Sequence, residues 1–206
     1  MIHYRIAPPL NSGKPLPRVQ WVRDPSGTRV IYSALAFHRK DEPLSNDEIS
    51  RFNNCVEFSL KPSNGPLDFV CAPMSREYLV SHRIRSSIDD LEPGKHQFIA
   101  MSLIMPDAWR NILEDTRYYW LNCCTRLEAI DIPRSDLVSP VPGSPYLGPA
   151  QDDSEIAIIK RIVRDHHLWM SIVTVAGGHT FVSEALAEKW RAMDAGPIEL
   201  LPCIMV

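Results

Sequence analysis

The chain has 206 residues and a mass of 23.4 kDa, which suits one large or two small domains and excludes an elaborate multidomain enzyme. Hydrophobic residues make up 45% and charged residues 23%, so a disordered or fibrous chain is excluded. Only 9 residues are glycine and 18 are proline, a balance that favours rigid turns over glycine-rich phosphate-binding loops.

Charge is unevenly distributed along the chain. Residues 1–40 carry seven Lys or Arg and one acidic residue, Asp24, which gives a net charge of +6, whereas residues 41–206 carry −9. The basic stretch contains no run of Lys or Arg, and its prolines exclude a regular basic helix. The acidic remainder argues against a dedicated nucleic-acid binder. A nucleic-acid-binding accessory protein that uses residues 1–40 stays open as an alternative.

The cysteines and the N-terminus bear on the compartment. The five cysteines form neither a C-x-x-C pair nor an even set for disulfide bonds. The N-terminus lacks the apolar core of a signal peptide, and no stretch approaches the roughly 18 apolar residues that a membrane span needs. We therefore predict a reduced, cytoplasmic protein without a membrane partner.

The predicted elements fall into two parts, a β-rich N-terminal region (residues 1–67) and an α+β domain (residues 68–206). In the first part, Ser45-Asn-Asp-Glu48 is a capping box that opens a short helix reaching Phe52. Runs of β-branched and aromatic residues between turn residues predict strands, of which the first two form a hairpin. These strands are Val19–Val22, Val30–Phe37, a brief one around Phe58 and Leu60, His96–Met105 and Arg117–Cys124. The proline-rich residues 139–151 are expected to be a loop or a boundary.

An approximate internal repeat is the most informative feature. Tyr78-Leu-Val-Ser81 and Thr180-Phe-Val-Ser183 each introduce a segment that reaches a glycine 13 residues after the serine, at Gly94 and at Gly196. Apolar residues recur 3, 7 and 10 positions after each serine, which places them on one helical face. The serine can cap the helix N-terminus, and the glycine can adopt the left-handed conformation after the C-terminus. Each copy is therefore expected to be a strand, a capped helix and a strand.

Together these elements predict an α+β fold with a mixed or antiparallel sheet, two principal capped helices in a quasi-repeat and an N-terminal β-rich subdomain. We expect the two helices to pack on one shared sheet, to which Leu168–Val175 and His179–Val182 add a hairpin. Two alternatives stay open: a chance similarity of two amphipathic helices, and one continuous sheet that spans both parts.

The sequence lacks the common motifs of catalytic and nucleotide-binding sites. It contains no G-x-S-x-G, G-x-x-x-x-G-K-[ST], H-E-x-x-H or G-x-G-x-x-G. His166 and His167, with His179, raise the question of a zinc site. Adjacent residues of a strand point to opposite faces, so the pair is not expected to share one ion. We predict no metal and no cofactor.

The adjacent residues Cys123 and Cys124 raise the question of a nucleophile with His96 as its base. They follow Tyr118-Tyr-Trp-Leu121, and at least one of them is expected to pack as a small hydrophobic residue of that strand. We predict no catalytic residues, and a small cysteine/histidine hydrolase stays as an alternative.

Several separated motifs occur in an order that points to one bacterial family. They are Leu91-Glu-Pro-Gly94-Lys-His96-Gln-Phe98, Tyr118-Tyr119, Leu127-Glu-Ala-Ile-Asp131 with Ser135, His166-His167-Leu-Trp169, Phe181-Val-Ser183-Glu-Ala-Leu186, Gly196 and Glu199-Leu-Leu-Pro202. From about Asp68 to Pro202 the chain resembles a family of immunity proteins of bacterial polymorphic toxin systems, built on a domain formerly of unknown function. The resemblance implies a non-enzymatic protein that binds and neutralises a cognate toxin in the producing cell or its kin. The toxin is then expected to be a secretion-system effector used in bacterial competition.

A candidate toxin-binding site lies in the polar loop after the strand at His96–Met105. An inhibitor needs a rigid surface with aromatic or arginine anchors and complementary charge, and it does not need an active site. The loop offers one tryptophan among mixed charges, at Asp107, Trp109, Arg110, Glu114 and Asp115. The competing interpretation is an ordinary strand connection whose Trp109 packs into the core.

Overall fold

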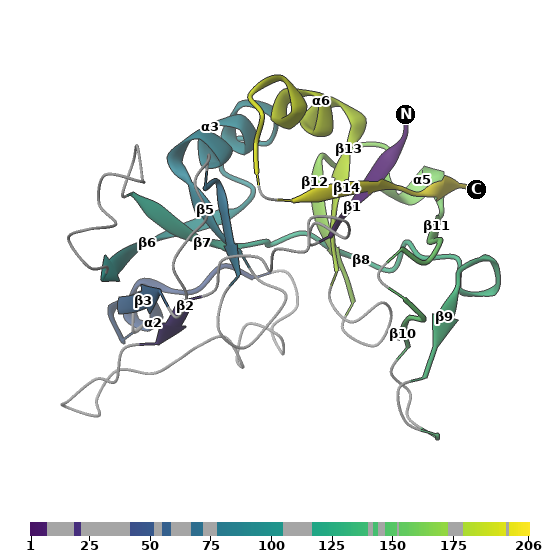
Figure 1. The fold of residues 1–206 in the computed structure, drawn as a ribbon, viewed down its shortest axis with the longest axis horizontal. Coiled ribbons are helices and arrows are strands. Elements are labelled where there is room, and N and C mark those ends of the chain that lie inside the picture. Colours follow the sequence, from purple (N-terminus) through teal and green to yellow (C-terminus); the bar gives the residue numbers. More distant parts are fainter. Residues whose placement is uncertain are drawn as a thin grey trace.

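The computed structural model describes residues 1–7, 19–21, 42–51, 55–58, 67–71, 78–104, 117–139, 142–143, 147–151, 153–172, 179–196 and 198–206. Figure 1 shows two sheets side by side, with helix α3 over one and helix α6 over the other. The fold is α+β, as predicted. Within the part of the chain that is described, no helix is long and apolar enough to cross a membrane.

The larger sheet has six strands in the order β2-β3-β6-β7-β5-β4. Their bounds are β2 Val19–Trp21, β3 Cys55–Phe58, β4 Phe69–Cys71, β5 Tyr78–Ser81, β6 Gln97–Ile104 and β7 Tyr118–Asn122. The second sheet has five strands in the order β14-β1-β13-β12-β8. Their bounds are β1 His3–Ala7, β8 Arg126–Leu127, β12 Leu168–Ser171, β13 Thr180–Ser183 and β14 Glu199–Pro202.

Two strand pairs and short helices complete the described elements. The strands are β9 (Leu137–Val138), which pairs with β10 (Gly148–Pro149), and β11 (Ala157–Ile158), which pairs with β15 (Ile204–Met205). The helices are α2 (Asn46–Arg51), α3 (His82–Leu91), α5 (Lys160–Val163), α6 (Glu184–Ala192) and the 3-10 turn η1 (Ile132–Arg134).

The predicted repeat is confirmed at its two helices. The Ser81 hydroxyl accepts the backbone N–H of the residue three positions on at 3.4 Å, and the Ser183 hydroxyl does the same at 3.3 Å. Gly94 takes the predicted left-handed conformation, with φ of 70°. The prediction for Gly196 is wrong, because Asp194, two residues earlier, turns the chain with φ of 51°.

The expectation of one shared sheet is wrong, because each helix covers its own sheet. The two halves nevertheless share a core, in which Ile84 and Ile88 of α3 cluster with Leu186 and Trp190 of α6. Between the helices, the indole N–H of Trp190 donates a hydrogen bond to the Ser87 hydroxyl at 2.8 Å. The apolar helix faces thus bind the halves together, which is why a shared sheet is not needed.

The repeat extends from the helices to the strands beneath them. In the larger sheet, Val80 of β5 pairs with Tyr119 of β7. In the second sheet, Val182 of β13 pairs with Tyr4 of β1 in the same place. The sheet orders β4-β5-β7-β6 and β12-β13-β1-β14 therefore correspond strand for strand. The N-terminal strand β1 takes the place in the second copy that β7 has in the first.

The outer strands correspond as well. Val56 of β3 pairs with Leu103 of β6 in a parallel ladder. Ile158 of β11 pairs with Met205 of β15, also in parallel. Each of these residues in the second copy lies 102 positions after its counterpart, the spacing that also separates Ser81 from Ser183. Within the described residues, the main strands and helices thus follow one α+β arrangement twice, and β1 completes the second copy.

Several local predictions can be compared with the structure. The capping box is confirmed, since Ser45 N donates to the Glu48 carboxylate at 2.8 Å and Glu48 N donates to the Ser45 hydroxyl at 3.3 Å. The antiparallel pairing of β12 with β13 is confirmed. The predicted strand at Val30–Phe37 lies outside the described residues. Among the described part of the proline-rich residues 139–151, Gly148 and Pro149 form the short strand β10.

The predicted boundary between residues 67 and 68 stays a prediction. Strands from before it pair with strands from after it, since β1 lies between β13 and β14, and β3 lies beside β6. Arg5 of β1 is accordingly buried, with 1% of its surface exposed. One of the seven basic side chains of residues 1–40 is therefore inside the fold.

Candidate functional site

The residues predicted to bind a partner, Asp107, Trp109, Arg110, Glu114 and Asp115, lie outside the described residues. They belong to the segment 105–116, which connects β6 to β7. Their role stays a prediction from the sequence.

The cysteine site weighed as an alternative lacks the geometry of a nucleophile and its base. Cys123 is buried, and burial raises the pKa of its thiol to about 12, so no thiolate forms at neutral pH. The half-buried Cys124 thiol donates to the Asn122 carbonyl at 3.4 Å. Nδ1 of His96 has no hydrogen-bond partner among the described residues, so the imidazole does not hold either thiol.

The paired histidines face different partners. His167 Nδ1 lies 2.7 Å from the Ser183 hydroxyl, at the cap of α6. Burial, followed by the charge of Lys95, lowers the pKa of His166. Within the described residues, no group of three or more His, Cys, Asp or Glu side chains is placed to hold a metal ion.

Glu92, just after α3, occupies the junction between the two copies. Its side chain is fully buried. One carboxylate oxygen accepts the backbone N–H of His167 at 3.0 Å and Lys95 Nζ at 3.1 Å. The other accepts the backbone N–H of Leu168 at 2.9 Å and lies 2.8 Å from His96 Nε2. The carboxylate therefore ties the end of α3 to the start of β12.

The hydrogen bonds of Glu92 decide its protonation. Burial alone acts to raise the pKa of the carboxyl group, but the hydrogen bonds from His96 and from the His167 backbone outweigh it and lower the pKa to about 2. The group is a buried, fully bonded anion at neutral pH. The sequence analysis assigned no role to Glu92. The signal that could have indicated one was its place within the motif Leu91–Phe98.

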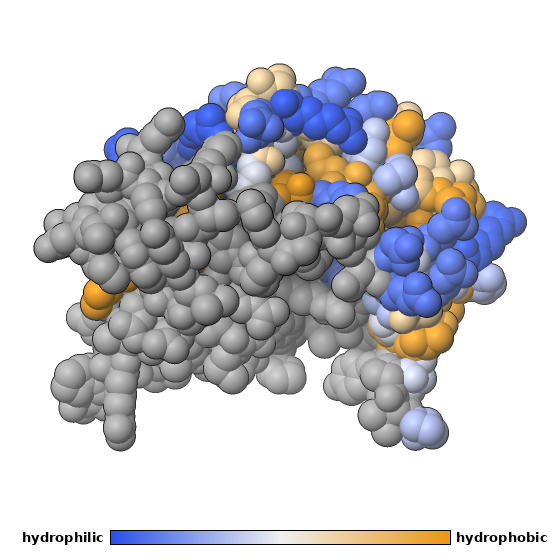
Figure 2. All heavy atoms as spheres, viewed as in Figure 1, coloured by the Kyte–Doolittle hydropathy of each residue, from blue (hydrophilic) through white to orange (hydrophobic). Residues whose placement is uncertain are grey.

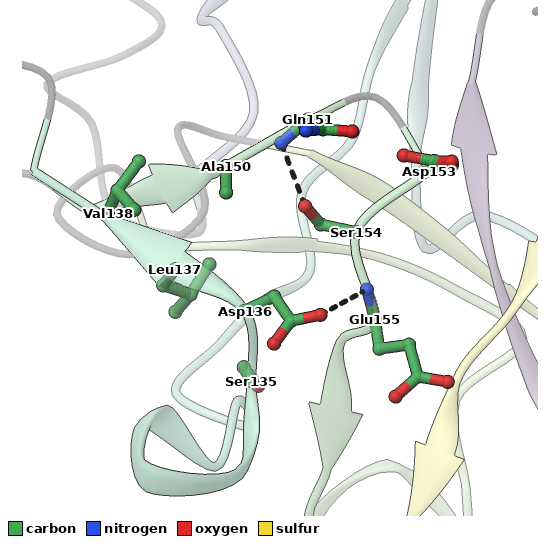
Figure 3. A pocket seen from close by; sticks show the side chains of 9 residues that line it. All are labelled: Ser135, Asp136, Leu137, Val138, Ala150, Gln151, Asp153, Ser154 and Glu155. Carbon is green, nitrogen blue, oxygen red and sulfur yellow. Dashed lines mark hydrogen bonds between the residues drawn. The ribbon is translucent and has the colours of Figure 1, made fainter.

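A concave acidic surface lies beside β9 and β10 (Figure 3). This hollow, about 590 Å³ in volume, is lined by β9, by Ala150 after β10 and by the turn before β11. Its described lining contains three carboxylates, Asp136, Asp153 and Glu155, and no basic side chain. Asp136 accepts the Glu155 backbone N–H at 3.3 Å, and the Gln151 N–H donates to the Ser154 hydroxyl at 2.8 Å, so the turn is held in place. We refer to it as the acidic hollow.

The surroundings of the acidic hollow suit a protein partner. Residues 128–156 contain six acidic side chains and a single basic one, Arg134. Two large apolar side chains of the same stretch are exposed, Ile132 at 44% and Val138 at 48%. Figure 2 shows hydrophobic and hydrophilic surface adjoining on the right, over β9, β11 and the C-terminal strand. Exposed apolar side chains rimmed by charge are the chemistry of a protein-binding surface.

The comparison with known families assigns the chain to one of them. The Immunity protein family (Imm11) matches residues 12–204. The match covers most of both copies, and the chain belongs to this family. A search of curated proteins found no match.

Proposed function

We propose that the protein neutralises one cognate toxin by stoichiometric binding and without catalysis. The observation that carries the proposal is membership of an immunity protein family over residues 12–204. The buried Cys123 thiol, and a His96 ring that bonds Glu92 and neither cysteine, support binding over cysteine hydrolysis. The toxin is expected to be a secreted effector of a polymorphic toxin system, against which the chain protects the cytoplasm of the producing cell.

The charge distribution supports a toxin with a basic face. Residues 41–206 carry a net charge of −9, and the acidic hollow concentrates three carboxylates on one concave surface. Opposite charge across an interface raises the association rate and fixes the partner's orientation. The acidic hollow therefore supplies a rim of complementary charge.

The sequence supplies a candidate anchor for the same partner. We propose that Trp109 is the central apolar contact, with Asp107, Arg110, Glu114 and Asp115 around it. Buried tryptophans surrounded by weaker contacts carry much of the energy of protein interfaces.

The proposed function is tested with the cognate toxin domain, which we expect the neighbouring gene to encode. Co-purified proteins are expected to form a 1:1 complex, as measured by the mass of the complex in solution, and co-expression is expected to rescue growth. A chain that neither binds the neighbouring toxin nor protects cells from it contradicts the proposal.

The anchor is tested separately by substitution. Trp109→Ala should weaken toxin binding by about 30- to 1,000-fold through faster dissociation, and Glu114→Lys should slow association most at low salt. Thermal unfolding is the control, because a core tryptophan would destabilise the fold by about 3–5 kcal/mol when truncated. A stable Trp109→Ala protein with full affinity refutes the anchor and leaves the immunity function standing.

A further inference from the structure

The two copies differ where the first residue of a central strand lies beside the serine that caps the helix. In the first copy, Tyr118 of β7 pairs with Ser81, and the Tyr118 hydroxyl donates to the Leu67 carbonyl. In the second copy, His3 of β1 pairs with Ser183. A tyrosine hydroxyl stays neutral between pH 7 and pH 5, whereas a histidine can gain a charge near this range. Of these two equivalent residues, His3 is therefore the one that can respond to mild acid.

The hydrogen bonds of the buried His3 ring suit only its neutral form. The Trp169 indole N–H donates to His3 Nδ1 at 3.3 Å, so Nδ1 is an acceptor and the other nitrogen, Nε2, carries the proton. Nε2 is itself buried and has no hydrogen-bond partner among the residues that the structure describes. A second proton would bind Nδ1, where it would displace the Trp169 N–H and leave two donors facing each other. Protonation therefore breaks the one hydrogen bond that holds the ring.

The charged groups around His3 also oppose a positive ring. They are His167 and His166, which precede β12, and the N-terminal amino group, and each of them disfavours a further positive charge. The Glu184 carboxylate of α6 lies 3.5 Å from the Ile2 N–H and makes no hydrogen bond to the ring. Burial and these neighbours lower the pKa of His3 to about 4. A state in which His3 is in water therefore takes up the proton much more readily than the sheet does.

The start of β1 must leave its sheet for His3 to reach water. β1 lies between β13 and β14, and the His3 carbonyl accepts the Cys203 N–H at 2.9 Å. The Cys203 thiol is buried and accepts a hydrogen bond from the Arg5 backbone. Two residues of β1 thus lie against Cys203, so release of the strand uncovers this thiol.

We propose that His3 is an acid-sensitive lock on β1: its protonation favours release of the strand from between β13 and β14, while the first copy stays folded. The folded pKa of about 4 lies below the ordinary 6.5, so the lock holds fully above that value and weakens as the pH falls. Opening should become about 20-fold more favourable between pH 7 and pH 5. Glu92, with a pKa of about 2, keeps its charge over this range and still ties α3 to β12. The lock is independent of toxin binding.

The test compares two buried thiols of the unaltered protein. Cys203 lies against β1, whereas the Cys123 thiol, just after β7, donates to the Thr125 carbonyl at 3.5 Å. Burial raises the pKa of both thiols to about 12, so each is expected to react only in an open state. Labelling by dithiodipyridine is followed at pH 7 and pH 5 by mass spectrometry of the peptides, and each rate is divided by that of the same thiol in the urea-unfolded chain. The corrected Cys203 rate should rise about 20-fold in acid and exceed the Cys123 rate at least about tenfold at pH 5.

Two matched substitutions assign the effect to one histidine. His3→Gln keeps an acceptor for the Trp169 N–H but takes up no proton, so the corrected Cys203 rate should change by less than about threefold between pH 7 and pH 5. His82→Gln, at the start of α3 in the first copy, should keep the wild-type response. Equal corrected rates for Cys203 and Cys123 at pH 5 overturn the proposal, because the whole chain then unfolds at once. A wild-type Cys203 rate that does not rise in acid, or a rise that His3→Gln retains, also overturns it.

Discussion

Replacing Glu92 with Gln tests the junction between the two copies. The carboxylate accepts four hydrogen bonds, two of them from the backbone N–H groups of His167 and Leu168. An amide of the same size has one acceptor oxygen, so at least one buried backbone N–H loses its partner. Leaving a buried donor unpaired costs about 1–3 kcal/mol, and a hydrogen bond to a charged group contributes about 1.5–3 kcal/mol. We expect Glu92→Gln to lower the free energy of unfolding by about 2–4 kcal/mol at pH 7.

The pKa of Glu92 gives an independent estimate of the same quantity. A folded-state pKa of about 2, against an ordinary value of 4.5, corresponds to about 3 kcal/mol of stability. Because the folded pKa is the lower one, this stability is fully present above about pH 5 and is lost as the pH falls towards 2. The difference between wild type and Glu92→Gln should therefore shrink over this range.

The assay is urea unfolding at pH 7 and at pH 4, with Tm as a second readout. At about 2–4 °C per kcal/mol for a chain of this size, a loss near 3 kcal/mol lowers Tm by about 6–12 °C. Glu188→Gln, the same change at an exposed position of α6, is the control and should stay within about 0.5 kcal/mol of wild type. A Glu92→Gln protein as stable as this control at pH 7 would refute the reasoning.

Three further predictions concern the fold. Burial, with help from the charges of His167 and the N-terminus, lowers the pKa of His3 to about 4, so the free energy of unfolding should fall by about 2 kcal/mol between pH 7 and pH 5. In urea unfolding, His3→Gln should remove this pH dependence, and a wild-type stability that does not change with pH contradicts the prediction. Ser87→Ala leaves the buried Trp190 indole N–H unpaired and should lower the stability measured by thermal unfolding by about 1–3 kcal/mol, whereas Ser86→Ala, at an exposed position, should change it little. Equal losses in the two variants would refute the stabilising role of the Ser87–Trp190 hydrogen bond. A circular permutant that joins residue 206 to residue 1 and opens the chain within residues 105–116 should fold with an unchanged circular dichroism spectrum, because the link from β6 to β7 in the first copy corresponds to the new link from β15 to β1 in the second. An unfolded permutant contradicts the correspondence of β1 with β7.

Local signals in the sequence predicted the helices well. Ser81 and Ser183 precede an apolar face of helical period, and serine is among the preferred residues at the N-cap position of a helix. The capping box at Ser45 was predictable for the same reason. The left-handed residue near Gly196 was not, because Asp194 can adopt the same conformation and nothing local excludes it.

Long-range pairings were harder to predict than local elements. The five residues of β1 form a short buried strand whose partners lie almost the whole chain away, and no periodicity names those partners. The same limit applies to Glu92, whose role depends on two backbone N–H groups 75 and 76 positions later. The sequence therefore predicted the repeat at the two helices and missed it in the order of the strands, since strand order is decided by tertiary packing.

Titration of the toxin's activity with this protein tests the central claim most directly. The toxin domain is held at a fixed concentration far above Kd, and its residual activity is measured as the protein is added. Stoichiometric binding predicts a linear loss of activity that ends at one equivalent, with full activity recovered when the complex is dissociated. Inactivation of many toxin molecules by each molecule of this protein, or full toxin activity at several equivalents, would contradict the account.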